Sequence, residues 1–384
     1  MKSLTVILTI FCCFNIPAQI TIEEKEISNG VVHKKIINTK DTLSINILSI
    51  DLAGDKYILR SVKAKNRLNA KETTSEMVEM LNDSGYNVIA AVNADFFEDN
   101  GEVVNNMVSE GNFVKGVKFT DSPYNPFVNS QFAVTFDNKL LIEQFVFNSN
   151  IILPGGTLKE INKINSIADS NSLSLFNSYQ GNYTPSTPDK WKVVEFVLNP
   201  IENNLDTLIF VVDKIFKGGN TKINENDFIL SSNNNFAYYL ERELVEADTI
   251  KFFLKLSPYY SGIRTLVGGW PRLVSDGKNV IKTNSKIEGI FPNFSVIKHP
   301  RTGIGFSKDS TIIYFITVDG RQETSRGMSL EDFADLMISE GVYQGLNLDG
   351  GGSTTMVINN KVVNNPSDST GEREVGNCLV LIKK

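Results

Sequence analysis

Alternating apolar and polar positions dominate much of this chain. Residues 26–66 read as a series of short strands with turns at Gly30 and Gly54. Between about 120 and 290 the pattern again shows short strands, separated by polar loops rich in Asn and Ser. A strict period of two with frequent turn residues predicts strands paired in mixed or antiparallel sheets.

Two helical patterns interrupt these strands. In "TTSEMVEMLNDSG", Thr74 or Ser75 can cap a helix that Gly85 ends, and in "MSLEDFADLMISEG" a second helix begins at Ser329 and ends at Gly341. Strands with a few packed helices predict an α+β fold. No clear linker divides the chain, so we expect one domain with a decorated middle segment, with two independent domains as the alternative.

Each predicted helix leads into an apolar strand that ends in Asn-x-Asp. The first strand ends in Asn93 and Asp95, and the second in Asn347 and Asp349. Residues i and i+2 of a strand share a face, so each unit presents an amide and a carboxylate together. We expect two half-sites that face each other across a cleft. Coincidence is the alternative, because this tripeptide is common at turns in an Asn-rich chain.

A glycine run follows the second of these aspartates, in "LNLDGGGSTTMV". Glycine permits sharp turns and leaves backbone N–H groups uncovered, so a ligand can approach the main chain. A structural hairpin needs fewer glycines, and no Lys follows as in a nucleotide P-loop. We expect a ligand-facing loop made of Gly350, Gly351, Gly352, Ser353 and Thr354.

Other candidates lie near strand ends and turns. Asp319 ends the strand "TIIYFITVDGRQ", and Arg301 in "HPRTGIGF" suits bidentate contact with a phosphate or carboxylate, or else forms a surface salt bridge. The remaining candidate binding residues are Gly268, Gly269, Arg321, Asn365 and Arg373.

Composition narrows the class of protein. The 384 residues are 41% hydrophobic and 21% charged, as in a globular protein, and the net charge of −6 argues against a nucleic-acid partner. His33 and His299 are isolated from each other and from Cys378, so no zinc cluster is expected. Cys378 reads as a small buried hydrophobe on a closing strand.

The N-terminus reads as a targeting segment. Residues 1–18 combine an early Lys with a short apolar stretch and Ala18, which predicts a cleaved signal peptide and export to the periplasm or the outside. Lipidation of Cys12 or Cys13 is the alternative. The apolar stretch is too short for a membrane span, and no other segment is apolar enough.

Several motifs together resemble the phosphodiester glycosidase family. These are "NADFF", "GGWPRLVSDGK", "PRTGIGF", "TVDGRQETSRGMSLEDFADLM", "LNLDGGGSTTMV" and "NNPSDSTGEREVGNCLVL", and they are densest over 87–111 and 262–384 of a domain spanning 19–384. Two positions depart from the family pattern, where Asp95 replaces a glycine and Trp270 enters a glycine cluster.

The resemblance implies hydrolysis of a sugar-1-phosphodiester, such as one of N-acetylglucosamine, at the glycosidic bond. Glycoside hydrolysis commonly uses carboxylates, so we rank Asp349, then Asp319, then Asp95 as catalytic candidates. The partner is then a carbohydrate phosphodiester and no cofactor is required, although these carboxylates could hold Ca²⁺ or Mg²⁺. A cell-surface protein that binds sugar phosphates without catalysis is the alternative, and a metal-dependent phosphodiesterase is a third reading.

Overall fold

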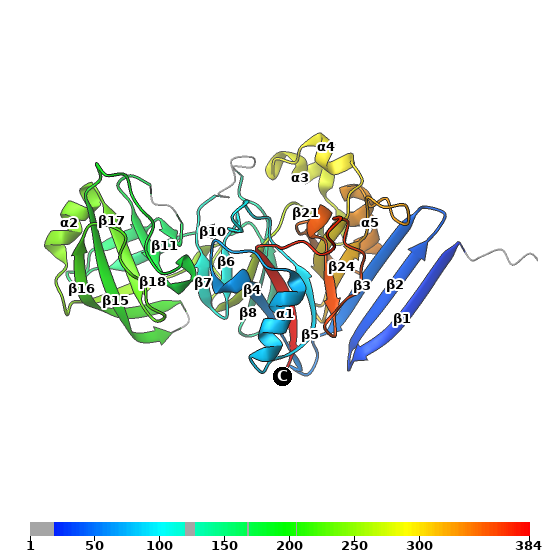
Figure 1. Ribbon diagram of the computed structural model, residues 1–384, viewed down its shortest axis with the longest axis horizontal. Coiled ribbons are helices and arrows are strands. Elements are labelled where there is room, and N and C mark those ends of the chain that lie inside the picture. The colour runs from blue at the N-terminus through cyan, green and yellow to red at the C-terminus, as the bar shows by residue number, and fades with distance from the viewer. Residues whose placement is uncertain (1–18, 120–126, 167–168, 205) are drawn as a thin grey trace, which may run out of the picture.

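The computed structural model describes residues 19–119, 127–166, 169–204 and 206–384. The predicted signal peptide, residues 1–18, lies outside the described residues. The structure is mostly β, with antiparallel pairing in nearly all the sheets and a few helices packed on their faces (Figure 1). It is richer in strands than the α+β prediction, because the middle segment pairs into a large sheet of its own.

The first sheet has eight strands and runs across the right-hand part of the molecule in Figure 1. In spatial order the strands are β1 (Ile20–Ser28), β2 (Val31–Asn38), β3 (Leu43–Asp51), β24 (Ile312–Val318), β23 (Arg301–Phe306), β25 (Gln344–Asn347), β21 (Arg272–Ser275) and β22 (Lys278–Asn279). Strands from the two ends of the chain therefore lie side by side, since β24 pairs with β3 from Ile45↔Val318 to Asp51↔Ile312.

Two five-stranded sheets pack next to the first. One has the order β27 (Lys361–Val362), β26 (Met356–Ile358), β5 (Asn87–Asn93), β28 (Asn377–Lys383) and β4 (Tyr57–Lys63). The other has the order β7 (Asn112–Lys115), β6 (Met107–Ser109), β20 (Ile263–Gly268), β8 (Gln131–Thr135) and β9 (Leu140–Glu143).

The middle segment forms a lobe at the left of Figure 1. Its eight-stranded sheet has the order β12 (Leu158–Ile161), β11 (Ser149–Ile152), β18 (Thr249–Phe253), β16 (Thr207–Lys217), β15 (Val193–Asn204), β17 (Phe228–Asn233), β14 (Leu173–Phe176) and β13 (Lys163–Ile164). A short pair, β10 (Val146–Phe147) with β19 (Leu256–Ser257), adjoins it. The apolar core of the lobe continues into β6, β8, β9 and β20, and the prediction of a single domain stays a prediction.

The helices are α1 (Thr74–Asp83), α2 (Asn235–Glu243), α3 (Ile281–Ile287), α4 (Pro292–Val296) and α5 (Leu330–Ser339), and the 3₁₀ turns are η1 (Ala64–Asn66), η2 (Ser178–Gln180) and η3 (Gly351–Ser353). The cap of α5 at Ser329 is confirmed, because its hydroxyl accepts from Asp332 N at 3.1 Å. The predicted cap of α1 is wrong by one position. Thr73 caps it, because only Thr73 has Glu76 at the spacing of a capping box.

The two helices predicted from the sequence cover opposite sides of the sheet pair. Helix α5 packs Leu330, Phe333 and Met337 on the outer face of the first sheet, and α1 packs Met77 and Leu81 on the second sheet. A third apolar cluster fills the space between these sheets. As predicted, Cys378 is a fully buried residue on β28, where burial raises the pKa of its thiol.

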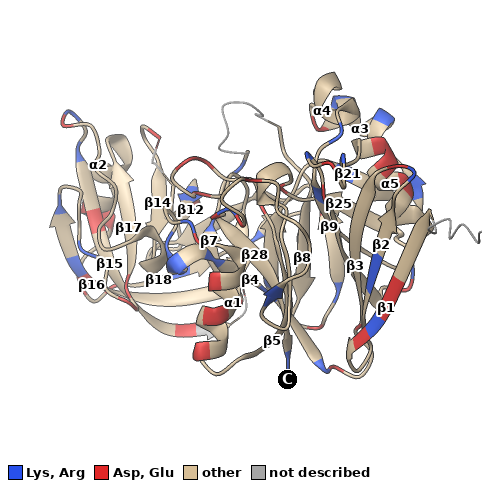
Figure 2. Ribbon diagram, turned by 45° about the vertical axis from the view of Figure 1, so that its right-hand side comes forward, with Lys and Arg blue, Asp and Glu red and all other residues tan. Residues whose placement is uncertain are grey.

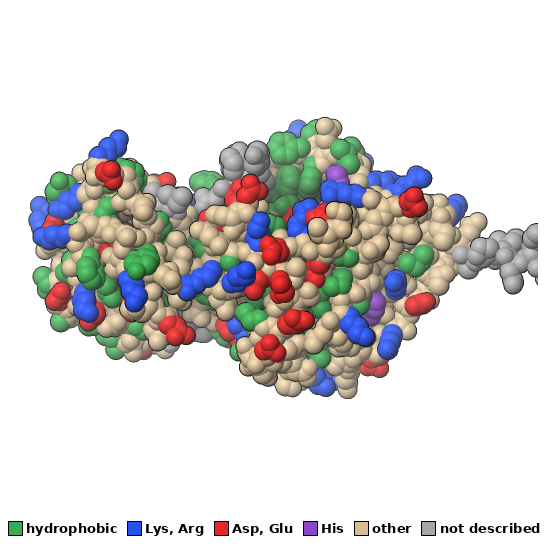
Figure 3. All heavy atoms as spheres, in the orientation of Figure 1, with side chains coloured by type: hydrophobic (Ala, Val, Ile, Leu, Met, Phe, Trp, Pro, Cys, Tyr) green, Lys and Arg blue, Asp and Glu red, His purple; other side chains and the backbone are tan. Residues whose placement is uncertain are grey.

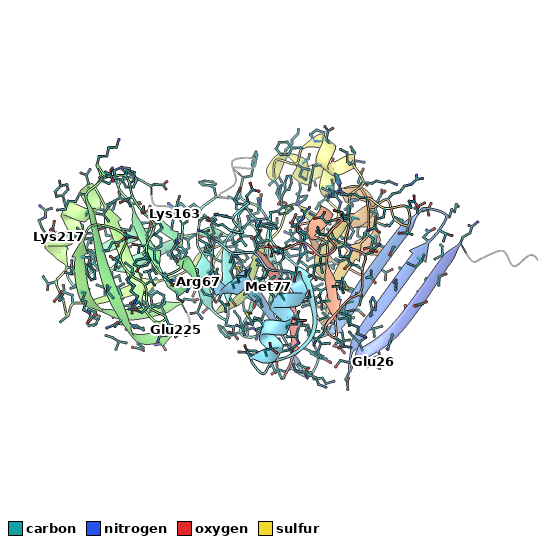
Figure 4. All side chains as sticks on the ribbon, viewed as in Figure 1. Glu26, Arg67, Met77, Lys163, Lys217 and Glu225 are labelled. Carbon is teal, nitrogen blue, oxygen red and sulfur yellow. The ribbon has the colours of Figure 1, made fainter. Side chains whose placement is uncertain are left out.

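Charges are spread over the whole molecule and not gathered on one element (Figure 2). Glu26 on the edge strand β1 lies near one end of the molecule, and Lys217 lies near the other (Figure 4). In the parts of the chain that the structure describes, no helix has the length and apolar character needed to cross a membrane.

Candidate active site

Three predicted site residues come together because of strand direction. Strands β24 and β25 both pair antiparallel with β23, so they run in the same direction and their C-terminal ends lie on the same side of the first sheet. Asp319 follows the end of β24, Asp349 follows the end of β25, and Arg301 begins β23 on that side. The strand topology therefore brings two carboxylates and a guanidinium to the same end of these three strands.

The two Asn-x-Asp segments lie next to each other at these strand ends. Asn93 donates through Nδ2 to the backbone oxygen of Asp349 at 2.6 Å, and Asp349 N donates to the backbone oxygen of Ala94 at 2.9 Å. Asn93 Oδ1 accepts from Thr302 Oγ1 at 2.8 Å, which ties the first sheet to the second. The helix-strand repeat in the sequence thus marks two segments that lie side by side, and Asn93 positions the Asp349 loop.

Asp95 is enclosed by protein, with only 1% of its surface exposed. Its Oδ1 accepts from Asn105 Nδ2 at 2.8 Å, and its Oδ2 accepts from Gly268 N at 3.2 Å. Burial raises the pKa of Asp95 to about 7. A side chain at position 268 would collide with this carboxylate, because a Cβ there would lie 2.4 Å from both oxygens. The glycine at 268 therefore makes room for Asp95.

Asp319 is also buried and organises the neighbouring loops. Its carboxylate accepts from Ser44 Oγ at 2.7 Å, from Asn365 N at 2.9 Å and from Asn364 Nδ2 at 3.2 Å. Burial raises the pKa of Asp319 although these hydrogen bonds lower it. The backbone N–H of Asn365 is thus used to hold Asp319, and the Asn365 amide pairs with Gln322.

Asp349 differs from the other two because part of the residue is exposed, whereas Asp95 and Asp319 are buried residues. Burial raises the pKa of Asp349 to about 6, while the charges of Arg373 and Arg321 act in the opposite direction. Of the three candidate residues, it is the one with surface open to solvent. Two guanidinium groups are close enough for their charges to act on its carboxylate, and a pair of arginines suits a negatively charged ligand.

The glycine run after Asp349 leaves space for groups of the protein itself. A Cβ at Gly350 would lie 2.6 Å from the Pro300 oxygen, and one at Gly351 would lie 3.0 Å from Arg321 Nη2. At Gly352 it would lie 2.2 Å from Arg373 Nη2. The absence of side chains at Gly351 and Gly352 therefore leaves room for the guanidinium groups of Arg321 and Arg373. That the loop exposes its backbone to a ligand stays a prediction.

The two arginines differ in their partners. Arg373 is paired with Asp368, through Nε to Oδ2 at 2.7 Å and Nη2 to Oδ1 at 3.0 Å. It lines a surface pocket whose other lining residues are Lys71, Phe97, Asp99, Asp368, Thr370, Glu372 and Glu374. Arg321 is exposed and has a positive φ of 59°, a strained backbone conformation for a side chain of this size. Asp368 was not predicted from the sequence.

Arg301 has a different environment from the one predicted. It is 2% exposed, and its guanidinium donates to the backbone oxygens of Met328, Phe294 and Ile297 at 2.9, 3.3 and 3.0 Å. Burial and the Arg321 charge lower the pKa of Arg301 to about 10. These contacts fix the segment that carries α4. Its role as a phosphate ligand stays a prediction.

The remaining predicted residues support the loops. Asn347 donates from Nδ2 to the backbone oxygens of Trp270 and Leu348 at 2.7 and 2.8 Å, and Gly269 packs against Leu346 and the Asn347 oxygen. Ser353 and Thr354 are buried directly after the glycine run. The Ser353 hydroxyl acts on the Asp349 carboxylate and lowers its pKa, and the Thr354 hydroxyl has no hydrogen-bond partner among the described residues.

Apolar side chains border the site on one side. Ile287, Phe291, Val296 and Ile297 are exposed on or beside α3 and α4. Figure 3 shows hydrophobic side chains gathered over these helices on the face turned to the viewer. Trp270 stacks on Phe294 with ring centroids 4.6 Å apart, so the departure from the family's glycine cluster anchors α4.

The described residues contain no group of three or more His, Cys, Asp or Glu side chains placed to hold a metal ion. Both carboxylate oxygens of Asp95 accept from N–H donors. This arrangement gives no support to a Ca²⁺ or Mg²⁺ site formed by Asp95, Asp319 and Asp349.

The protein is thus mostly β, and the Asp349 carboxylate lies at the end of inner strands, where the charges of Arg321 and Arg373 act on it. The family model described as phosphodiester glycosidase matches residues 195–382 of this chain. The resemblance to the phosphodiester glycosidase family is therefore confirmed.

Individual relatives match over shorter stretches. The mouse (Mus musculus) N-acetylglucosamine-1-phosphodiester alpha-N-acetylglucosaminidase is 30% identical over 130 residues, which are 34% of this chain and 24% of the relative. The SPbeta prophage-derived uncharacterized protein YomE of Bacillus subtilis is 42% identical over 85 residues, which are 22% of this chain and 13% of YomE. The chain thus spans at most about a quarter of these relatives.

The fold itself recurs in solved structures. A hypothetical protein from Synechocystis superposes with a TM-score of 0.72 at 16% sequence identity, over 96% of this chain and 64% of that protein. This likeness supports the fold.

Proposed function

We propose that this protein hydrolyses the glycosidic bond of a sugar-1-phosphodiester, with N-acetylglucosamine-1-phosphodiester as the model substrate. The observation that carries the proposal is the partly exposed residue Asp349, on whose carboxylate the charges of Arg321 and Arg373 both act. The family match and the printed name of the mouse relative support the same reaction class.

The chemistry needs an ionised carboxylate and a stabilised leaving group. Asp349 either attacks the anomeric carbon or takes a proton from the water that does, and both roles require its charged form. The bond between the anomeric carbon and the phosphate oxygen breaks, and its electron pair leaves with the phosphate monoester. Because that leaving group is a weak base, the positive charge of Arg321 and Arg373 contributes more than a proton donor does.

The other two carboxylates have supporting roles in this proposal. Asp319 holds Asn364 and Asn365, and Asp95 holds Gly268 and Asn105. Both are 3% exposed or less, so contact with substrate falls to Asp349. We therefore keep Asp349, then Asp319, then Asp95 as the order of catalytic candidates, because the exposure of these residues decreases in that order.

We further propose that the protein is exported, on the strength of the signal-peptide pattern in residues 1–18. A glycosidase that hydrolyses sugar phosphodiesters outside the cytoplasm needs no nucleotide or redox cofactor, since hydrolysis uses only water.

The direct test compares two substrates of one sugar. Purified protein is incubated with the methyl phosphodiester of N-acetylglucosamine 1-phosphate and, separately, with an uncharged aryl glycoside of the same sugar. Release of free sugar chiefly from the phosphodiester is the expected result. Saturable binding of the phosphodiester with no sugar released would instead make the protein a binding module.

A further inference from the structure

His299 lies beside the site but belongs to none of the predicted catalytic groups. It precedes Pro300, where the chain enters β23, and it is half-buried. Its backbone is fixed against the loop that follows Asp319, because His299 N donates to Met328 O at 3.2 Å and Met328 N donates to His299 O at 3.0 Å. The imidazole therefore starts from a rigid position.

The contact with Arg321 determines which ring nitrogen carries the proton. Arg321 Nη2 lies 3.3 Å from His299 Nδ1. A guanidinium group has only N–H donors and no acceptor, so Nδ1 must accept, and the hydrogen of the neutral ring is on Nε2. Burial, Arg301 and Arg321 together lower the pKa of His299, which favours this neutral form.

Because neutral His299 is its partner, Arg321 keeps its full positive charge. Arg373 shares its charge with the carboxylate of Asp368. Among the described residues no carboxylate forms an ion pair with Arg321, whose guanidinium is held by His299 on one side and faces Gly351 on the other. An imidazole can orient a guanidinium without neutralising it. Arg321 is thus the arginine of the site that no carboxylate among the described residues holds in an ion pair, although its charge also acts on Asp349.

The strained backbone of Arg321 also indicates that this residue belongs to a ligand site. Its φ of 59° is rare for a long side chain and costs free energy, so such conformations persist where the surroundings impose them and cluster at ligand sites. Here the strain places the guanidinium between His299 and the Asp349 loop.

We propose that His299 is a positioning and phosphate-binding residue. It orients Arg321 through Nδ1, and its Nε2–H donates to a second oxygen of the phosphate group that Arg321 binds. The identity of that phosphate as part of a sugar phosphodiester rests on the proposed function. The existence of the His299 and Arg321 anion site does not.

Nuclear magnetic resonance of ¹⁵N-labelled histidine tests the tautomer directly, because the chain has only two histidines. His33→Gln assigns the two signals. In phosphate-free buffer at neutral pH, His299 should show a protonated Nε2 and an unprotonated Nδ1. Added inorganic phosphate should shift the Nε2–H signal of His299 and leave His33 unchanged. A protonated Nδ1, or a His299 signal that ignores phosphate, would overturn the proposal.

Affinity for inorganic phosphate provides the second measurement. His299→Ala should weaken binding about tenfold, since a hydrogen bond to a charged group is lost. His299→Gln should restore most of the affinity, because its amide can accept from Arg321 and also donate. His33→Gln is the matched control and should bind as the wild type does. Equal affinity of His299→Ala and wild type would contradict the proposal.

The two proposals fail in different ways. If phosphate binds as expected but no sugar phosphodiester is cleaved, the proposed function is wrong and the anion site stands. If sugar is released while His299 neither shifts with phosphate nor affects its affinity, the role of His299 is wrong and the function stands.

Discussion

At the scale of single residues, the account depends on the charge of Asp349. Asp349→Asn keeps the backbone bonds to Asn93 and Ala94, so the protein should fold normally. Turnover of a sugar phosphodiester should fall by about 100-fold or more, because a base or nucleophile is lost. Steady-state kinetics on the folded variant measure this.

Asp276→Asn is the matched control for that substitution. Asp276 is exposed and also has a positive φ, which Asn tolerates, so its variant should keep wild-type turnover. Near-normal turnover by a well-folded Asp349→Asn protein would remove Asp349 from the mechanism and make Asp319 the next candidate.

The pH profile should report the same carboxylate. Because burial raises the pKa of Asp349 to about 6 and the reaction needs its ionised form, kcat/KM should fall about tenfold per pH unit below that value and level off above it. The acid limb should persist in His299→Gln, which removes the imidazole from the site. A profile that stays flat down to pH 4.5 would show that Asp349 does not limit the reaction.

Arg301 should behave as a structural residue. Arg301→Lys cannot reach the three backbone oxygens that the guanidinium bonds, so we expect a loss of roughly 1.5–3 kcal/mol in the free energy of unfolding. Denaturant unfolding measures it, with the exposed Arg326→Lys expected within about 0.5 kcal/mol of wild type. A stable Arg301→Lys protein with weakened phosphodiester binding would instead restore the role that the sequence suggested.

The sequence predicted residues of the site better than their surroundings. Asp95, Asp319 and Asp349 could be placed at the ends of strands because strand ends are visible in the pattern of apolar positions. The pairing of Arg373 with Asp368, and the full enclosure of Asp95, depend on loop conformations that carry no periodicity. The side of a strand end that faces solvent is decided by the packing of a second sheet, which the local sequence does not show.

At the scale of elements, the glycine loop has a specific steric requirement. Gly352→Ala places a Cβ 2.2 Å from Arg373 Nη2 and 2.3 Å from Asp368 Oδ1, so the ion pair of these two residues must shift. We expect KM for the phosphodiester to rise roughly tenfold with little change in stability, since the φ of Gly352 is not positive. Gly155→Ala, where a Cβ meets nothing within 4 Å, is the control.

An unchanged KM in Gly352→Ala would show that the position of Arg373 does not matter for binding.

The start of α5 could be predicted from local chemistry, since Ser329 caps it as expected. The start of α1 was predicted one residue too late, because the capping box of Thr73 and Glu76 was overlooked. The short helices α3 and α4 could not be predicted in this way, because their packing on Trp270 and Leu273 fixes them more than their own propensity does.

At the scale of the whole molecule, strands that are distant in the sequence pair to form the candidate active site. Strand β3 from the N-terminal region pairs with β24, and Ser44 of β3 donates through Oγ to the Asp319 carboxylate. Such pairings between distant segments are not encoded in any local pattern. For the same reason the sequence indicated strands in the middle segment but not the separate lobe that they form.

Catalysis by the whole protein should be independent of zinc. The described residues offer no cluster of metal ligands, and the proposed reaction uses carboxylate and guanidinium groups only. Turnover after exhaustive chelation should match that of untreated protein. Loss of activity that Zn²⁺ alone restores would contradict this expectation.

The bond that is broken distinguishes a glycosidase from an enzyme that cleaves the phosphate ester. The methyl phosphodiester of N-acetylglucosamine 1-phosphate is hydrolysed in water enriched in ¹⁸O, and the products are analysed by mass spectrometry. Attack at the anomeric carbon predicts ¹⁸O in the released sugar and unlabelled methyl phosphate. Label in the methyl phosphate, which does not exchange its oxygens with water, would mean cleavage of the bond between phosphorus and oxygen and would contradict the proposed reaction.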